Sequence, residues 1–292
     1  MTSAPALSLG RAYRRTKAPS SFEAVRETDS DALVSRIHAC EAGYLPPDEY
    51  APLFARPGRP HSRRPPLISI GTFLRAQLVD RYVDAFLRTG SLNGTEPTQE
   101  RAASARTLHR YMELDFTESV QSKVASIQHH SALAAPLGQV HTTSHSLTAD
   151  TYALLGTDLS TLATQPTEWA AIAELLDPAY PTLVLCECVL AYLERDAADA
   201  LLTQFMKHAP RVSVLSYDMC IAGDAPHVDA EATRFGQVML QNLGARQLIL
   251  PGARTCTTPT AVAGAAARRA RASHATRASR RGGRTGNAVG SL

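Results

Sequence analysis

Acidic side chains follow several short apolar segments of this 292-residue chain, at the positions where strands would end. The most informative segment is Thr182–Cys186, whose apolar and partly β-branched residues predict a buried strand followed directly by Glu187. Open α/β sheets bind ligands at the carboxyl ends of their strands, so Glu187 is a candidate ligand contact. A partly buried acid can instead cap the next helix or pair with an arginine. From this segment alone, that structural role is the better interpretation of Glu187.

Three further segments have the same form. They are Tyr111–Leu114 before Asp115, Thr151–Leu155 shortly before Asp158, and Val212–Tyr217 before Asp218. Helical patterns separate the later strands, at Glu168–Leu176 and Ala198–His208. This alternation predicts a parallel sheet in an α/β fold. An acid that closes the second strand of a nucleotide-binding sheet typically hydrogen-bonds ribose hydroxyls, and this is the chemistry that such acids could perform.

Helical patterns also precede and follow these strands. The first is predicted at Thr28–Cys40, with Ser30 or Asp31 as its cap, and a late amphipathic helix at Thr233–Leu243. Between them, an apolar stripe from Ile68 to Leu87 predicts a long helix that contains Arg75. An arginine in such a place is ordinarily on a solvated face. The functional alternative for Arg75 is a guanidinium that binds a carboxylate through two hydrogen bonds.

Composition divides the chain into a folded domain, residues 28–256, and two segments expected to be disordered, residues 1–27 and 257–292. Within the domain, residues 89–110 contain no apolar segment suited to a central strand and predict an atypical loop, with at most a short helix at Gln99–Arg106. The C-terminal part, residues 254–292, contains eight arginines and no acid or lysine. Since the whole chain has a formal net charge of only +3, the residues before 254 have a net negative charge. This does not indicate a specific nucleic-acid-binding domain.

The chain has no apolar segment of transmembrane length and no secretory signal, so we expect a cytoplasmic protein that does not bind membranes. Its five cysteines form no Cys-x-x-Cys pair, and we expect reduced thiols and no metal site. Cys186 could act as a nucleophile only if a histidine or another base approached it, and the sequence indicates none. No catalytic residue is predicted.

Five motifs occur in a fixed order along the chain. They are Pro65–Ile68 with Gly71–Arg75, Tyr111–Phe116, Gly156–Leu159, Leu185–Tyr192 (Leu-Cys-Glu-Cys-Val-Leu-Ala-Tyr) and Arg234–Met239 (Arg-Phe-Gly-Gln-Val-Met). Together they resemble the leucine carboxyl methyltransferases, S-adenosylmethionine-dependent enzymes that methylate the C-terminal leucine of type 2A protein phosphatase catalytic subunits. The resemblance covers roughly residues 28–256, with a gap, and its last two motifs are the most specific.

The resemblance implies a Rossmann-like S-adenosylmethionine-dependent methyltransferase sheet and a set of binding residues. The implied cofactor contacts are Arg36 as a basic contact, Arg75 at the methionine carboxylate, Asp115 at the ribose, Asp158 and Leu159 beside the adenine, and Glu187 near the methionine end. Tyr192 would lie near the substrate entrance. The implied partner is the catalytic subunit of type 2A protein phosphatase, and we expect the chain to act as a monomer.

Two elements of the family pattern are missing from the sequence. The family has a first strand and a Gly-x-Gly-x-Asp loop between the segments matched by Arg75 and Asp115, but only residues 89–110 are available here, and Gly90 and Gly94 do not form that motif. A C-terminal strand pair is replaced by the arginine-rich segment. The predicted sheet is therefore incomplete. Loss of a central strand would expose backbone groups of its neighbours and remove one wall of the cofactor site.

Three functions are compatible with these motifs. The first is carboxyl methylation, which requires no general base because the accepting carboxylate is already ionised at neutral pH, so that alignment of the reactants would dominate catalysis. The second is methylation of a modified tRNA base. The net negative charge of the residues before 254 and the lack of an appended repeat domain disfavour it. The third is a methyltransferase-like chain that no longer catalyses and at most binds a partner, which the missing glycine loop favours.

Overall fold

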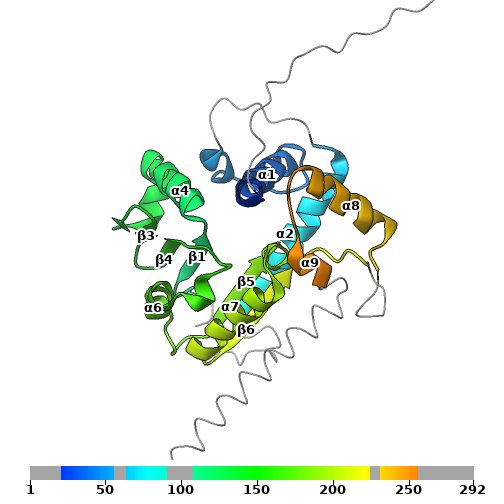
Figure 1. Cartoon of the computed structure of the whole chain (residues 1–292). Helices are drawn as coiled ribbons and strands as arrows, with labels where there is room; N and C mark the ends of the chain where they lie inside the picture. The colour runs from blue at the N-terminus through cyan, green and yellow to red at the C-terminus, as the bar shows by residue number, and fades with distance from the viewer. Residues whose placement is uncertain (1–20, 56–63, 91–107, 224–230, 256–292) are drawn as a thin grey trace, which may run out of the picture.

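A computed structural model describes residues 21–55, 64–90, 108–223 and 231–255 (Figure 1). Two helices, α1 (Ser21–Glu41) and α2 (Pro66–Thr89), precede the first strand, with a short 3-10 helix η1 (Ala51–Phe54) between them. The remaining elements are β1 (Tyr111–Asp115), α4 (Thr117–His129), α5 (Ser131–Ala134), η2 (Ala135–Leu137), β2 (His141–Thr142), β3 (Ser146–Thr148), β4 (Tyr152–Gly156), η3 (Leu162–Thr164), α6 (Pro166–Leu175), β5 (Thr182–Glu187), η4 (Leu190–Tyr192), α7 (Arg195–His208), β6 (Val212–Tyr217), α8 (Arg234–Ala245) and α9 (Pro251–Thr255).

The four predicted strands are all present, and they pair in parallel two by two. β1 pairs with β4, so that Asp115 lies opposite Gly156, and β5 pairs with β6, so that Glu187 lies opposite Tyr217. β4 also pairs with β3, and β3 with β2, in antiparallel fashion. The prediction of an α/β fold is thus confirmed, but the antiparallel β2–β3 extension makes the first sheet mixed and not purely parallel as predicted.

The described strands form two separate sheets and not one Rossmann-like sheet. Their orders are β1-β4-β3-β2 and β5-β6, and within the described residues β1 and β5 each pair with one strand only. Both sheets nevertheless pack on one hydrophobic core, which contains Trp169 of α6 and Phe205 of α7. Met112 and Leu114 of β1, Leu155 of β4 and Val184 of β5 all pack against it. Among the described residues, side-chain packing on a shared layer of helices joins the two sheets, and no backbone pairing does.

Two further apolar clusters complete the fold. One joins α4 to β3 and β4 through Val120, Leu147 and Leu154. The other joins η4 to α8 and α9 through Ala191, Ile221 and Leu250. In Figure 1, α4 covers the β3–β4 part of the molecule, and α8 and α9 lie beside the segment that leads out of β5. This third cluster contains Ala191 and packs against Tyr192, so it holds the C-terminal end of the Leu185–Tyr192 motif.

The helix boundaries correct two predictions. α1 begins at Ser21 and not at Thr28, so residues 21–27 are helical and the proposed disordered N-terminal segment is too long by these residues. Ser30 and Asp31 accordingly lie inside the helix and do not cap it. α2 and α8 agree with the prediction: Gly90 ends α2 in a left-handed conformation (φ 69°), and the Thr233 side chain caps α8 by accepting a hydrogen bond from the Gly236 amide. The atypical loop, the Gln99–Arg106 helix and the C-terminal segment fall largely on residues 91–107 and 256–292, outside the described residues.

Candidate functional site

The acid that ends β5 binds the arginine of α2. Arg75 Nε donates a hydrogen bond to Glu187 Oε1, and both side chains are about two thirds buried. Burial alone would lower the pKa of Arg75, but the contact with Glu187 outweighs it and the pKa is raised. Directly after Glu187, Cys188 adopts a left-handed backbone (φ 55°), so the chain turns sharply at the strand end. The structure thus brings together two predicted site residues that lie 112 positions apart in the sequence.

The acid at the end of β1 lies near a carboxylate of α1. Asp115 Oδ1 accepts a hydrogen bond from the Phe116 amide at 2.7 Å. Burial raises the pKa of Asp115, and the negative charge of Asp29 raises it further. Asp29 is an exposed residue of α1, and partial burial of its carboxyl group raises its own pKa. The negative charge of Asp29 thus acts on Asp115 at the carboxyl end of β1, a position from which Asp115 could accept hydrogen bonds from ligand hydroxyls.

The acid that follows β4 has a clear structural role. Asp158 Oδ1 accepts hydrogen bonds from the Ser160 amide (2.9 Å) and the Ser160 hydroxyl (2.7 Å), which fixes the turn that leads into η3. Leu159 packs against the core that contains Trp169. The Thr157 amide bonds the Asp115 carbonyl at 2.8 Å, so this turn is tied to the end of β1. The role of Asp158 and Leu159 as adenine contacts stays a prediction.

Tyr192 lies in η4, immediately beyond the strand-end motif. Burial raises the pKa of Tyr192, and a side-chain hydrogen bond with Thr28 of α1 partly offsets that effect. The preceding residue, Ala191, donates its amide to Asp218 Oδ1 at 3.3 Å, and the Ser216 hydroxyl donates to Asp218 Oδ2 at 2.9 Å. Asp218, the acid after β6, therefore fixes the η4 turn. Burial raises the pKa of Asp218 as well.

Arg36 is held apart from the other predicted site residues. Its Nε donates to Asp48 Oδ2 at 2.6 Å, and half of its side chain is exposed. Asp48 also accepts the amides of Tyr50 and Ala51, so it closes the turn that leads into η1. The hydrogen bond that Arg36 donates to Asp48 raises the pKa of Arg36. Among the described residues, no contact links Arg36 to Arg75 or Glu187, and its role as a cofactor contact stays a prediction.

Sequence reasoning missed two residues that the structure places beside the predicted site. The charge of Asp29 acts on Asp115, and Thr28 lies beside Tyr192. Both belong to α1, and no motif of the sequence marks them. The spacing of three residues predicts that Thr28 and Asp31 lie on one face of a helix. It does not predict which residues they contact.

Other kinds of site find no support in the part of the chain that the structure describes. There, no three His, Cys, Asp or Glu side chains gather as metal ligands. Cys40, Cys186, Cys188 and Cys220 form no disulfide bond with one another, and the pKa of Cys188 is raised by burial, which disfavours the reactive thiolate. None of the described helices combines the length and apolarity that a membrane span requires.

Comparison with known proteins places these residues in one family. A model of the leucine carboxyl methyltransferase family matches residues 32–206, a range that contains all seven predicted site residues. Among curated proteins, the chain is 33% identical to leucine carboxyl methyltransferase 1 of Mycosarcoma maydis, over 81% of this chain and 65% of the relative. It is 31% identical to the protein of that name from Cryptococcus neoformans (strain JEC21), over 84% and 76%, and 29% identical to the one from Bos taurus, over 80% and 71%.

The chain thus spans just under two thirds of the Mycosarcoma relative. The aligned stretch with that relative, 337 residues, is longer than the 292 residues of this chain, so the relative contains segments that have no counterpart here. The match to the family model still covers more than half of this chain and includes the Arg75–Glu187 pair. The chain therefore belongs to the leucine carboxyl methyltransferase family.

Proposed function

We propose that this chain transfers a methyl group from S-adenosylmethionine to the α-carboxylate of a C-terminal leucine, and that its substrate is the catalytic subunit of type 2A protein phosphatase. The observation that carries the proposal is the Arg75–Glu187 pair at the end of β5, inside the segment that matches the family model. Asp115 and Asp158 follow the parallel strands β1 and β4 at the matching end of the other sheet. Strand ends are where α/β folds bind their ligands.

The side chains present suit the chemistry of this cofactor. Arg75 uses Nε for Glu187, and within the described residues its two terminal nitrogens have no hydrogen-bond acceptor, so they are suited to the methionine carboxylate. Glu187 would accept hydrogen bonds from the methionine ammonium group. Asp115 has a second carboxylate oxygen for the ribose hydroxyls, because only one oxygen bonds the Phe116 amide.

When bound, S-adenosylmethionine supplies an electrophilic methyl group on a sulfonium ion. The residues of this chain then have to orient the leucine carboxylate, which is ionised at neutral pH and needs no base. Burial raises the pKa of Tyr192, so its hydroxyl stays protonated and can donate a hydrogen bond to one oxygen of that carboxylate. The other oxygen is then the nucleophile. Burial of Arg75, Glu187 and Tyr192 would also limit water at the site.

Calorimetric titration with S-adenosylmethionine tests the proposal. Arg75→Ala and Glu187→Gln should each weaken binding by about 10- to 100-fold, the range expected for loss of a charge-assisted contact. Arg81→Ala is the matched control, because Arg81 lies on the same helix with an exposed side chain, and it should bind like the unmodified chain. A folded chain that shows no binding at millimolar S-adenosylmethionine would refute the proposal.

A second function, partner binding without methyl transfer, is supported by the division of the strands into two sheets. A site that lacks one wall would hold the cofactor loosely and admit water, and either effect would slow the reaction. Labelled methyl transfer to the phosphatase separates the two functions, since only the first gives a labelled product.

We further propose that the chain is a monomer located in the cytoplasm. Sedimentation velocity over a range of concentrations tests the first statement, and imaging of the tagged chain in cells tests the second. A dimer or a signal confined to an organelle would reject the corresponding statement.

A further inference from the structure

α1 contacts elements that belong to both sheets. Arg26 pairs with Glu118 of α4 at 3.8 Å, on the β1–β4 side, and Thr28 lies beside Tyr192 of η4, on the β5–β6 side. Asp31 binds Arg246, which follows α8. In Figure 1, α1 accordingly lies between α4 and α8. Because the described strands of the two sheets do not pair with each other, α1 is one of the elements that set their relative positions.

The middle of α1 is fixed by polar contacts. Its fully buried side chains are confined to its two ends, Ala24 on one side and Ile37 and Ala39 on the other. From residue 25 to residue 36, no described side chain is fully buried. Apolar packing therefore fixes the rotation of these central turns about the helix axis only weakly. Ion pairs are directional and can determine this rotation.

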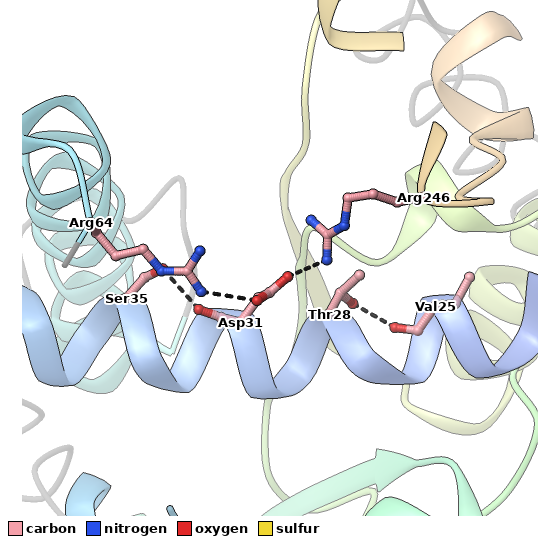
Figure 2. Close-up of polar contacts among 6 residues, drawn as sticks. All are labelled: Val25, Thr28, Asp31, Ser35, Arg64 and Arg246. Atoms are coloured by element: carbon pink, nitrogen blue, oxygen red, sulfur yellow. Dashed lines mark hydrogen bonds and ion pairs between the residues drawn. The ribbon is translucent and has the colours of Figure 1, made fainter. Parts of the chain in front are cut away.

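Asp31 provides such contacts in two directions (Figure 2). Its Oδ1 accepts from Arg64 at 2.9 Å, just before α2, and its Oδ2 accepts from Arg246. Burial alone would raise the pKa of Asp31, but the hydrogen bonds from Arg246 and Arg64 outweigh it and lower the pKa. The neighbouring hydroxyls of Thr28 and Ser35 donate to carbonyls of α1 itself, at 2.6 and 2.8 Å. Within Figure 2, only Asp31 links α1 to other elements.

The residues next to Asp31 face the candidate site. Thr28, one turn earlier, meets Tyr192, and Asp29 approaches Asp115 at the end of β1. A rotation or shift of the central turns of α1 would move both contacts at once, since all three residues belong to one rigid helical segment. The Asp31 contacts and the two contacts at the site are thus mechanically coupled.

We propose that Asp31 is a positioning residue of this site: by binding Arg64 and Arg246 it fixes α1 so that Thr28 supports Tyr192 and Asp29 stands opposite Asp115. The inference rests on the proposed function for its effect on cofactor and substrate, but its structural part can be tested without either. Asp31 contacts neither ligand and acts only through α1.

The first test is hydrogen exchange of the ligand-free chain. Asp31→Asn, which keeps the shape and removes the charge, should speed exchange of amides in residues 28–36 and 190–193 by about tenfold, and leave α6 and α7 unchanged. Asp31→Glu should restore slow exchange in part. Arg26→Gln, which removes a longer ion pair of α1, is the control and should change exchange at residues 190–193 little. Unchanged exchange at residues 28–36 and 190–193 in Asp31→Asn would overturn the proposal, whether or not the chain binds S-adenosylmethionine.

The second test is binding and kinetics. Asp31→Asn should weaken S-adenosylmethionine binding and raise the KM for a leucine-terminated substrate by about tenfold each, with kcat reduced less. Arg246→Gln should give a similar loss, and the double variant should lose no more than either single one, because both act through one contact. If Asp31→Asn only lowers the melting temperature and leaves binding intact, the contact is structural and the inference is wrong. If the unmodified chain itself binds no S-adenosylmethionine, the proposed function fails, and hydrogen exchange alone then decides the role of Asp31 in placing α1.

Discussion

Replacing Gly236 by alanine should destabilise the fold, whereas the same replacement at Gly244 should stabilise it. Both glycines lie in α8, where alanine is favoured over glycine by about 1 kcal/mol. A Cβ atom at Gly236 would lie 2.1 Å from the carbonyl oxygen of Ile221, where ordinary contact begins at 3.4 Å. A Cβ atom at Gly244 would meet no atom within 4 Å. The two positions therefore separate helix preference from steric conflict within one helix.

The carbonyl of Ile221 cannot move away at low cost. It accepts hydrogen bonds from the Thr233 amide (3.0 Å) and hydroxyl (3.2 Å), and the same hydroxyl accepts the Gly236 amide at 3.1 Å to cap α8. A clash of this kind costs about 1–3 kcal/mol and sometimes more, and the helix preference offsets part of it. Loss of the cap would add about 1 kcal/mol. We expect Gly236→Ala to lower the free energy of unfolding by about 2 kcal/mol, and Gly244→Ala to raise it by about 0.5 kcal/mol.

Urea unfolding followed by circular dichroism and by fluorescence of Trp169, the single tryptophan, measures both values. Coincident transitions by the two probes would show that α8 unfolds together with the core around Trp169. Gly236→Ala at or above the stability of the unmodified chain would refute the packing of α8 on Ile221. If Gly244→Ala instead lost as much stability as Gly236→Ala, the conflict with Ile221 would not be the cause of the loss.

Three further changes test other parts of the structure. Gly252→Ala, whose Cβ would lie 2.2 Å from the Leu190 carbonyl oxygen, should displace η4 and weaken substrate binding more than cofactor binding, as titrations with each ligand would show. Trp169→Phe keeps the apolar contact with Phe205 but loses the hydrogen bond to His208 (2.9 Å), and should cost about 1 kcal/mol in urea unfolding. The pKa of Asp31 is lowered on folding, so the ionised carboxylate contributes to the free energy of unfolding above about pH 4, and this contribution is lost as the pH falls further. Thermal unfolding of the unmodified chain and of Asp31→Asn measures it. The difference in stability between the two should shrink below about pH 4 and stay constant above it.

The strands that carry the candidate site could be predicted because each is a compact apolar segment that ends at an acid or a turn. Val212–Tyr217 coincides with β6, and Thr182–Cys186 differs from β5 by one residue. β2 and β3 have two and three residues, too few to show an alternating pattern, and they were missed. The start of α1 was missed because Ser21–Glu27 is mostly polar and has no apolar stripe of helical period.

Pairing of distant charges accounts for most of what the sequence could not show about the site. Arg75 and Glu187 were both selected, through a family motif, but nothing in the sequence indicated that they bind each other. Arg36 was selected in the same way, and its ion pair with Asp48 was not anticipated. Asp31 and Arg246 lie 215 positions apart, and only the packing of α1 against the end of α8 brings them together. Such contacts depend on tertiary structure and leave no local pattern.

Transfer of a labelled methyl group from S-adenosylmethionine to the catalytic subunit of type 2A protein phosphatase tests the central claim most directly. The substrate should be compared with the same subunit lacking its C-terminal leucine. We predict alkali-labile label on the intact subunit, none on the shortened one, and strongly reduced label when Glu187→Gln replaces the unmodified chain. A folded chain that binds S-adenosylmethionine yet labels neither subunit, or labels both equally, would contradict the account.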